Sequence, residues 1–564
     1  MQRENLHYMI RGTALAIFLG CGIGLSSFAQ SDIPKGWHLL DLETNHVYGI
    51  SLNKAYDLLA AKNKKPQPVI VAVLDSGVDT THEDLKKVLW RNPKEIPGNG
   101  IDDDKNGYVD DVFGWNFLGG KDGKSLKKAG DERARVFHKW KNRYQSTLID
   151  TNLLSATEKS QYQMWSKAAK ELNFSQEEMM DLMFIEVTAK ALKRHDKILR
   201  QEMGVDEYNC EKLEKFEPVT KAARDAKLGF LTVMKMLQID PEEKNSNALK
   251  ELEEYIEGKK SAFESKDIAP PNYRREIIGD DYENLSDRFY GNNDVMGPGP
   301  THGTHVSGII GAVRNNGIGI DGVADQVKIM TLRIVPDGDE YDKDIALAIR
   351  YAVDHGAKII NMSFGKSFSP EKAWVDSAVK YAEQKDVLLI HAAGNDAENL
   401  DSVENFPSPW LNPWKSYAKN YITVGASSDP NLGPSIAADF SSYGQYQVDV
   451  FAPGVKIFST IPGGNNYGNL KGTSMATPIV SGLAAILKSY YPQLTAIDIK
   501  KIIEQSAFKP ADDIKCLKPG QEPTIVPFKS LSKTGGIVNA FEAVKMANEF
   551  KPITTIKSST NTKK

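Results

Sequence analysis

Cysteine is scarce in this chain, with three residues among 564. Small secreted domains that cannot build a large core depend on several disulfides, and this sequence cannot supply them. Removal of a predicted N-terminal signal leaves Cys210 and Cys516, and neither has a histidine at metal-site spacing. The sequence therefore predicts two buried thiols or a single bridge, and it excludes a disulfide-rich scaffold.

An excess of charge of one sign is also absent. The 70 Lys and Arg residues nearly balance the 74 Asp and Glu residues, and the formal net charge is -4 at pH 7. This balance gives no electrostatic reason to expect a nucleic-acid partner. A hydrophobic content of 41% suffices for one large folded domain with a second module.

Long apolar runs are missing after the N-terminus. There, two arginines precede the apolar stretch Thr13–Leu25, and Ser27-Phe28-Ala29 supplies small residues before a cleavage point. The pattern predicts a signal peptide over residues 1–29 and a secreted or periplasmic protein. The stretch is too short and too rich in glycine for a membrane anchor, so we expect no integral membrane span. A lipid anchor at Cys21 is the less favoured alternative, because apolar residues continue beyond it.

The chain instead contains short apolar runs that alternate with amphipathic stretches such as Asp342–His355. Such runs are typical of strands buried on both faces. Their alternation with helices indicates an α/β fold with a doubly wound parallel sheet. Ligands bind beyond the carboxyl ends of the strands in such sheets, and Asp75 stands at the end of the first run. The runs cover residues 69–74, 327–335, 358–362, 387–390 and 421–424.

Three short segments carry the residue types of a nucleophilic site: Asp75-Ser76-Gly77, His302-Gly303-Thr304-His305 and Gly472-Thr473-Ser474. Taken singly, each is typical of a turn or a helix N-cap. A serine hydroxyl is a poor nucleophile without a histidine base, and that base needs a carboxylate to fix its tautomer. Together the segments predict Ser474 as nucleophile, one of the two histidines as base and Asp75 as the orienting group.

The order of these segments and the local sequence around each of them resemble those of the subtilisin-like serine proteases, which are also called subtilases or the peptidase S8 family. The resemblance runs from about Val69 to about Asn116 and again from about Gly279 to Ala547. It implies a subtilisin-like three-layer fold and a secreted serine endopeptidase, a hydrolase that cuts polypeptide substrates through an acyl-enzyme intermediate. It assigns the base to His302 and leaves a structural role for the second histidine. A metal at the two histidines would lack an acidic third ligand.

Two places are predicted to supply the oxyanion hole. Ser474 begins an apolar, small-residue stretch that predicts a buried helix, whose first backbone N–H groups can stabilise a developing oxyanion. The segment Ala392-Ala393-Gly394-Asn395 matches a family motif, and the resemblance implies that the Asn395 side chain donates to the oxyanion. Without the triad, a turn asparagine would be the preferred interpretation.

The resemblance also implies a substrate-binding strand at residues 361–365, with a primary specificity pocket beside it. An extended peptide would add to this strand through main-chain hydrogen bonds. Asn405 stands where the family closes the pocket, which would make the pocket narrow and polar. The residues predicted to bind substrate are Ser363, Phe364, Gly365, Ala393, Gly394 and Asn405.

Oxygen donors recur at alternate positions of residues 100–111, where a glycine allows a tight turn. This pattern suits a hard cation, and it predicts a structural calcium ion. The segment departs from an EF-hand, because Phe113 stands at the twelfth position and no flanking helix pair is evident. A solvated acidic turn is the alternative. The predicted ligands are Asp102, Asp104, Asn106, Tyr108, Asp110 and Asp111.

A second calcium site is implied by the resemblance alone. Asp84 and the loop Arg314–Ile320 match a family site formed by one carboxylate, one asparagine and loop carbonyls. Asn316 is the matching asparagine.

An insertion separates the first two motif segments, since His302 lies 227 positions after Asp75. From Ser125 to Pro270 the chain is rich in Lys and Glu, poor in Gly, and amphipathic in patches that predict several helices. The predicted boundaries are a signal peptide over 1–29, an N-terminal extension over 30–67, a catalytic domain over 68–120 and 279–550, an inserted helical subdomain over 121–278, and a polar tail over 551–564.

The inserted helices allow several interpretations: a decoration beside the cleft, a lid, an inhibitory element or a platform for a protein partner. The chief alternative to a protease is a catalytically silent binding protein of the same fold, whose insertion holds that partner. The complete triad and Asn395 argue against it. A third hypothesis is a maturation protease of narrow specificity with the insertion as selectivity filter. The short stretch before the first core strand leaves open whether a propeptide is removed.

Overall fold

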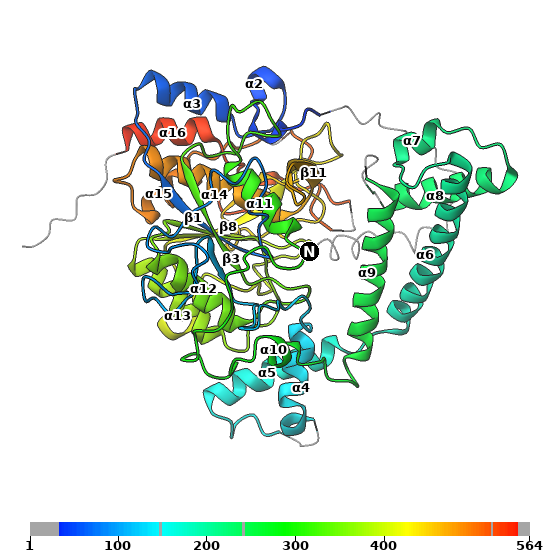
Figure 1. The fold of residues 1–564 in the computed structure, drawn as a ribbon, viewed down its shortest axis with the longest axis horizontal. Helices are drawn as coiled ribbons and strands as arrows, with labels where there is room; N and C mark the ends of the chain where they lie inside the picture. Colours follow the sequence, from blue (N-terminus) through cyan, green and yellow to red (C-terminus); the bar gives the residue numbers. More distant parts are fainter. Residues whose placement is uncertain are drawn as a thin grey trace, which may run out of the picture.

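A seven-stranded parallel β-sheet forms the centre of the protein (Figure 1). The computed structural model describes residues 33–145, 149–237, 239, 243–511, 513–520 and 523–550. The strand order β2-β3-β1-β4-β5-β8-β9 requires crossover connections between parallel neighbours, as in a doubly wound sheet. The strands are β1 (Val69–Asp75), β2 (Gly114–Asn116), β3 (Val327–Arg333), β4 (Ile359–Met362), β5 (Leu388–Ala392), β8 (Tyr421–Ser427) and β9 (Val450–Pro453).

Helices cover both faces of this sheet, because successive side chains of each strand point to opposite sides. In β1, Val71 and Val73 join one buried cluster, and Ala72 and Leu74 join the other. This three-layer α/β architecture confirms the predicted fold class. One layer contains α3 (Leu52–Ala61), α11 (Thr301–Gly311), α14 (Thr473–Tyr490), α15 (Ala496–Gln505) and α16 (Ala540–Glu549), and the other contains α12 (Asp342–Asp354) and α13 (Lys372–Gln384) (Figure 1).

The five predicted apolar runs became strands β1, β3, β4, β5 and β8. Strands β2 and β9 were not predicted. Strand β2 is three residues long and contains no apolar run, and β9 ends in a proline, a residue that disfavours a strand within a sheet.

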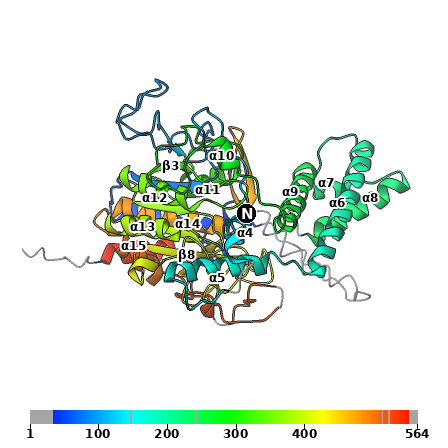
Figure 2. The same ribbon diagram turned by 90° about the horizontal axis from the view of Figure 1, so that it is seen from below.

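The inserted segment between β2 and α11 is helical, as predicted, and forms two groups of helices (Figures 1 and 2). The first group, α4 and α5, packs on the main body, where Phe137 and Leu172 bury Phe368. The second group, α6 to α9, has its own core and projects from the body as an arm. The bounds are α4 (Glu132–Tyr144), α5 (Ala156–Glu171), α6 (Gln176–Met203), α7 (Cys210–Lys215), α8 (Lys221–Met236), α9 (Asn245–Glu264) and α10 (Tyr273–Ile277).

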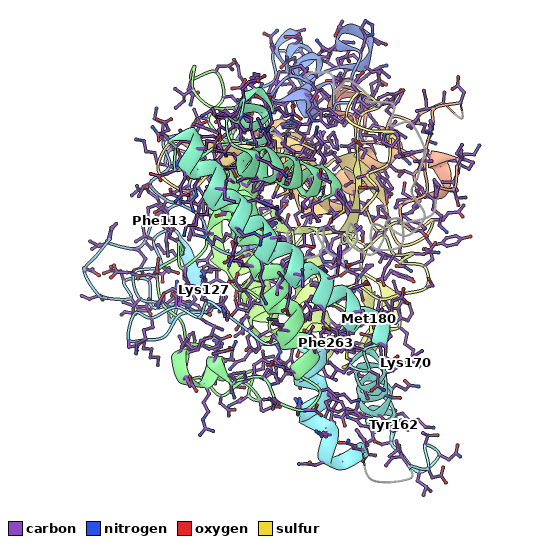
Figure 3. The ribbon with its side chains drawn as sticks, turned by 90° about the vertical axis from the view of Figure 1, so that its right-hand side faces the viewer. Phe113, Lys127, Tyr162, Lys170, Met180 and Phe263 are labelled. Atoms are coloured by element: carbon purple, nitrogen blue, oxygen red, sulfur yellow. The ribbon has the colours of Figure 1, made fainter. Side chains whose placement is uncertain are left out.

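Figure 3 shows the molecule from the side of this arm. Met180 near the start of α6 and Phe263 near the end of α9 lie close to the α5 end of the insertion. Leu192 and Leu199 of α6 pack with Phe230 of α8 in the core of the arm. The arm is therefore joined to the body through the region of α4 and α5.

The residues before β1 pack into the main body. Trp37 is buried and donates a hydrogen bond from Nε1 to the carbonyl of Val455 at 3.1 Å. Helix α3 lies against α16, near the opposite end of the chain (Figure 1). The remaining short elements are η1 (Trp37–Leu39), α2 (Leu42–Asn45), β6 (Trp410–Leu411), η2 (Asn412–Trp414), β7 (Ser416–Tyr417), β10 (Ile457–Ile461), β11 (Asn466–Leu470) and η3 (Phe528–Ser530).

In the described part of the chain, no disulfide joins Cys210 to Cys516, and both thiols are buried. This confirms the prediction of two buried thiols over that of a bridge. The predicted signal peptide, Cys21 and the polar tail lie outside the described residues. Among the helices that the structure describes, none combines the length and the apolar character that crossing a bilayer requires.

Candidate active site

The structure brings Asp75 and His302 together at the carboxyl edge of the sheet. Asp75 is the last residue of β1 and is buried, and its Oδ1 lies 2.7 Å from Nδ1 of His302. His302 stands in the first turn of α11, whose close approach depends on Gly303. A Cβ atom at Gly303 would lie 2.2 Å from the carbonyl oxygen of Gly77. The glycine after the histidine is therefore a packing requirement of this contact.

The other ring nitrogen of His302, Nε2, is buried and has no hydrogen-bond partner among the described residues. The Oδ1 atom of Asp75 also accepts a hydrogen bond from the backbone N–H of Ser76 at 2.7 Å. A carboxylate held in this way fixes Nδ1 as the protonated nitrogen of the neutral ring. The arrangement leaves Nε2 as the nitrogen that can accept a proton.

Ser474 is positioned by the strand next to β1. It lies in the first turn of α14, after Gly472, whose φ of 147° lies in the range that favours glycine. The Ser474 hydroxyl donates to the carbonyl of Ser363 at 3.2 Å, and the Ser363 hydroxyl donates to the carbonyl of Ser474 at 3.0 Å. Because β1 pairs with β4 in the register Leu74 to Met362, Asp75 and Ser363 lie at adjacent strand ends. Asp75 contacts His302, and Ser363 contacts Ser474.

Asn395 follows β5 and faces the start of α14. Its Oδ1 accepts hydrogen bonds from the backbone N–H of Thr473 at 2.8 Å and from the Thr473 hydroxyl at 3.0 Å. These two contacts orient the amide, so that Nδ2 is the end of the side chain available as a donor. Asn395 and Ser474 line the same cavity.

His305 lies deeper in α11 than His302 and is fully buried. Its Nε2 lies 3.1 Å from the carbonyl oxygen of Gly468, to which the neutral ring donates. Burial lowers the pKa of His305 to about 3, so the ring stays neutral at ordinary pH. These contacts tie α11 to the β10–β11 hairpin.

A cavity of about 350 Å³ opens beside Ser474 and Asn395. Of the residues predicted to bind substrate, Ser363 lies behind Ser474 and is absent from the lining of this cavity. Gly365 and Asn405 are in close contact, since a Cβ at Gly365 would meet Asn405 Oδ1 at 2.4 Å. Asn405 also donates from Nδ2 to the carbonyls of Ala392 and Ala393 at 3.1 and 3.0 Å. The predicted residues in the lining are Phe364, Gly365, Ala393, Gly394 and Asn405.

The predicted calcium loop brings two of its carboxylates together. Asp102 and Asp104 offer oxygens within 4.8 Å of one another and of Glu95. Glu95 is buried, and its Oε2 has no hydrogen-bond partner among the described residues, whereas its Oε1 accepts from the N–H groups of Asp103 and Asp104. A buried carboxylate oxygen without a donor beside two further carboxylates suits a hard cation.

The other four residues predicted in this loop have different partners. Asp110 accepts from the backbone N–H groups of Gly98 and Gly100, each at 2.8 Å. Asp111 accepts from the side chains of Asn92 and Asn106 at 2.8 and 2.9 Å. The Oδ1 atom of Asn106 accepts from the N–H of Tyr108 at 2.7 Å. These contacts shape the loop around the three-carboxylate cluster.

At the second predicted calcium position, Asp84 and Asn316 are in contact. Asp84 is fully buried, and its Oδ1 accepts a hydrogen bond from Asn316 Nδ2 at 2.5 Å. Its Oδ2 is 3.2 Å from the hydroxyl of Tyr467. The loop over residues 314–320 therefore closes directly onto this carboxylate.

Sequence reasoning missed two sets of residues. Glu95 lies seven positions before Asp102 and has no local pattern that marks it as a ligand. The cavity beside Ser474 is also lined by Asp131 and Arg133 of the insertion and by Asp339 of the main body. Their charges are ordinary in the sequence. The packing of α4 on the body places Asp131 and Arg133 in the cavity wall together with Asp339.

The chain is similar in sequence to one known protein family and to several known proteins. A sequence model described as "Subtilase family" matches residues 67–535. The chain is 43% identical over 209 residues to the thermophilic serine proteinase of Bacillus sp. (strain AK1), covering 37% of this chain and 47% of that protein. It is 38% identical over 222 residues to thermitase of Thermoactinomyces vulgaris, covering 39% of this chain and 72% of thermitase. The chain thus spans about half the length of the first relative.

Among solved structures, proteases from Pseudoalteromonas arctica PAMC 21717 match with 28% sequence identity and a TM-score of 0.36. That match covers 47% of this chain and 81% of the other.

Proposed function

The chain belongs to the subtilase family, and we propose that it is a serine endopeptidase that cuts polypeptide substrates through an acyl-enzyme intermediate. The observation that carries the proposal is the contact between Asp75 and His302, with Nδ1 and Oδ1 2.7 Å apart and Nε2 without a partner among the described residues. A histidine oriented in this way is the base that a serine nucleophile requires.

In the proposed mechanism, His302 Nε2 takes the proton of the Ser474 hydroxyl as Oγ attacks the substrate carbonyl. The imidazolium then donates that proton to the leaving amine, and the acyl-enzyme remains on Ser474. Water attacks this ester with His302 again as base, and the acid product leaves. Asp75 keeps its charge throughout and stabilises the imidazolium.

The developing oxyanion is stabilised by groups fixed before substrate binds. Thr473 holds the carbonyl end of Asn395, which directs Nδ2 of that side chain as donor. The first turn of α14 adds backbone N–H groups and the positive end of the helix dipole at Ser474. Preorganised donors of this kind are effective because they do not reorganise during the reaction.

The substrate is proposed to lie along residues 363–365, with one side chain in the cavity near Gly394 and Asn405. The close approach of Asn405 to Gly365 narrows this part of the cavity. The side-chain amide of Asn405 makes it polar. The extended substrate backbone would pair with the strand edge through main-chain hydrogen bonds.

We also propose structural calcium. Glu95, Asp102 and Asp104 are the side chains that fit an ion, because their oxygens cluster and Glu95 Oε2 has no partner among the described residues. Asp84 and Asn316 would hold a second ion together with loop carbonyls. Calcium at these sites would neutralise clustered carboxylates and stabilise the loops.

Export is proposed on sequence grounds, with removal of residues 1–29 as signal peptide. The proposed catalytic domain comprises residues 68–120 and 279–550, and residues 121–278 form the inserted subdomain. A secreted or periplasmic location fits a protease of polypeptide substrates.

Hydrolysis of casein by the purified mature protein tests the proposal. Ser474→Ala and His302→Ala should each abolish activity, while Ser160→Ala, an exposed serine of α5, should leave it unchanged. Casein hydrolysis that persists in Ser474→Ala would overturn the assignment of the nucleophile.

A further inference from the structure

The cavity beside Ser474 is built from two parts of the chain. Its main-body wall includes Asn395 and Gly365, and its other wall includes Asp131 and Glu171 of the insertion. Asp131 is the N-cap of α4, and Glu171 is the last residue of α5. The inserted helices therefore contribute directly to the surface that a substrate meets.

Backbone contacts fix the start of α4 to this cavity. The segment before α4 pairs with Asp337, since Asp337 N donates to the carbonyl of Lys127 at 2.7 Å and Ala129 N donates to that of Asp337 at 2.8 Å. The N–H of Glu132 donates to Asp339 Oδ2 at 2.6 Å. The seam between insertion and main body thus lies at Asp339, inside the cavity.

A buried ionic cluster connects the start of α4 to residues 363–365, the proposed substrate-binding strand. Lys366 follows Gly365 and is fully buried, and its Nζ lies 2.8 Å from both Glu132 Oε2 and Asp342 Oδ1. Arg135 pairs with Glu132 at 2.7 Å. These two cations and two carboxylates balance one another, so Lys366 adds no net positive charge to the cavity.

Carboxylates dominate the remaining lining. Arg133 lies 2.9 Å from Asp131 and 4.0 Å from Glu171, so its charge is shared between these two. Lys259 is the other cation in the lining. The six lining carboxylates are Asp131, Glu171, Asp339, Asp396, Glu398 and Glu404.

Two pairs of these carboxylates are brought together by the chain. Asp396 lies two positions before Glu398, and Asp339 accepts from the N–H of Glu132, the residue that follows Asp131. Burial and the neighbouring charge of Asp131 raise the pKa of Asp339 to about 6, although Arg135 acts in the opposite direction. Burial and the charge of Glu398 raise the pKa of Asp396 to about 6, against the weaker effect of Lys259. One crowded pair lies at the seam, and the other follows Asn395 directly. A cationic group beside either pair would relieve this repulsion.

We propose that the cleft selects basic polypeptide segments, with Lys or Arg side chains on the acyl side of the scissile bond held by the Asp396–Glu398 pair and by the Asp131–Asp339 pair. Guanidinium and ammonium groups pair well with clustered carboxylates, and partial burial strengthens the attraction. The inserted helices thereby act in substrate selection. This proposal rests on the proposed protease function and names its substrate class.

The test measures binding of two fluorescent peptides to Ser474→Ala by anisotropy at about pH 7.5. The peptides are identical except that Arg residues on the acyl side in one are Gln in the other. The Arg peptide should bind about tenfold tighter, equivalent to one pKa unit of differential interaction. Equal affinity for the two peptides, or tighter binding of the Gln peptide, overturns the proposal.

Variants in the same background assign the effect to residues. Asp339→Asn and Asp396→Asn keep hydrogen-bonding shape and remove charge, and each should lower the preference for the Arg peptide about threefold. Glu177→Gln, an exposed acid of α6 outside the cavity, is the matched control and should keep the full preference. A preference that survives both Asn substitutions contradicts the assignment. The melting transition of each variant is compared with that of Ser474→Ala. If one of the two Asn variants does not fold like this parent, the other one decides the test.

Failure of selectivity is distinguishable from failure of the protease function. Wild-type protein that hydrolyses casein but shows no charge preference in the binding assay overturns the selectivity alone. Selective binding with no hydrolysis by the wild type overturns the proposed catalysis alone.

Discussion

The ammonium of Lys366 lies 2.8 Å from Glu132, and both side chains are buried where the insertion meets the main body. Lys366 comes directly after the proposed substrate strand, and Glu132 begins α4. The backbone N–H and carbonyl of Lys366 also form hydrogen bonds with the backbone of Phe406, the neighbour of Asn405. One buried ion pair therefore connects the insertion to both sides of the pocket.

Removal of one partner of this pair should be costly. Glu132→Gln leaves Lys366 with Asp342 and removes the carboxylate that pairs with Arg135. An uncompensated buried charge costs about 3 kcal/mol of unfolding free energy. Denaturant unfolding measures the loss. Glu257→Gln, which breaks the exposed pair with Lys128, is the control and should change stability by less than about 0.5 kcal/mol. Equal effects of the two substitutions would contradict a structural role for the buried pair.

Calcium should raise the melting temperature of chelator-treated protein, because an ion that binds only the folded state stabilises it. Glu95→Gln and Asp104→Asn should weaken this effect, since both carboxylates belong to the cluster. Asp103→Asn is the control from the same loop, because its carboxylate accepts from Ile96 N and Asn99 Nδ2 outside the cluster. Differential scanning calorimetry with and without calcium provides the measurement. An unchanged melting temperature in wild type would exclude a stabilising ion.

The raised pKa of Asp396 predicts a stability that falls as pH rises. The folded-state pKa of about 6 exceeds the usual value of 3.8, so the folded protein binds the proton more tightly than the unfolded chain between these values. Asp396→Asn removes the charge next to Glu398 and Lys259. The variant should match wild type near pH 4 and be more stable than wild type near pH 8. Urea unfolding at both values checks this, and a variant less stable at the higher pH would contradict it.

Loss of the oxyanion donor proposed at Asn395 should lower turnover more than substrate binding. Asn395→Ala should reduce kcat by about 10² to 10³ with little change in KM, the loss that follows removal of one such donor in subtilisin. The expected split arises because the oxyanion exists in the transition state and not in the bound substrate. Steady-state kinetics on a peptide substrate measure both constants, with Asn247→Ala on α9 as control. A change confined to KM would assign Asn395 to ground-state binding.

The sequence predicted the structure correctly where a short segment combined a hydrophobic pattern with a functional residue type such as a carboxylate. The apolar runs predicted the central strands, and the segment that ends in Asp75 placed a carboxylate at the correct edge of the sheet. The glycines after His302 and before Ser474 have physical causes in the structure, namely the close approach to Gly77 and a positive φ. A short motif marks each glycine in the sequence, although the contact that requires Gly303 is made with the distant Gly77.

The sequence was uninformative where distant segments meet. Nothing in the pattern around Glu95 links it to Asp102, because their proximity depends on how the loop folds back. Asp131 and Asp339 likewise line one cavity from opposite sides of the seam between insertion and main body. Neither strand nor helix periodicity encodes which charges from two separate segments share a cavity.

Labelling by a fluorophosphonate probe, followed by peptide mapping of the modified residue, tests the central claim most directly. The account predicts that the mature protein is labelled on Ser474, and that His302→Ala and Asp75→Asn greatly reduce the rate of labelling while Ser160→Ala does not. Folded wild-type protein that is not labelled, or that is labelled on another residue, would contradict the account.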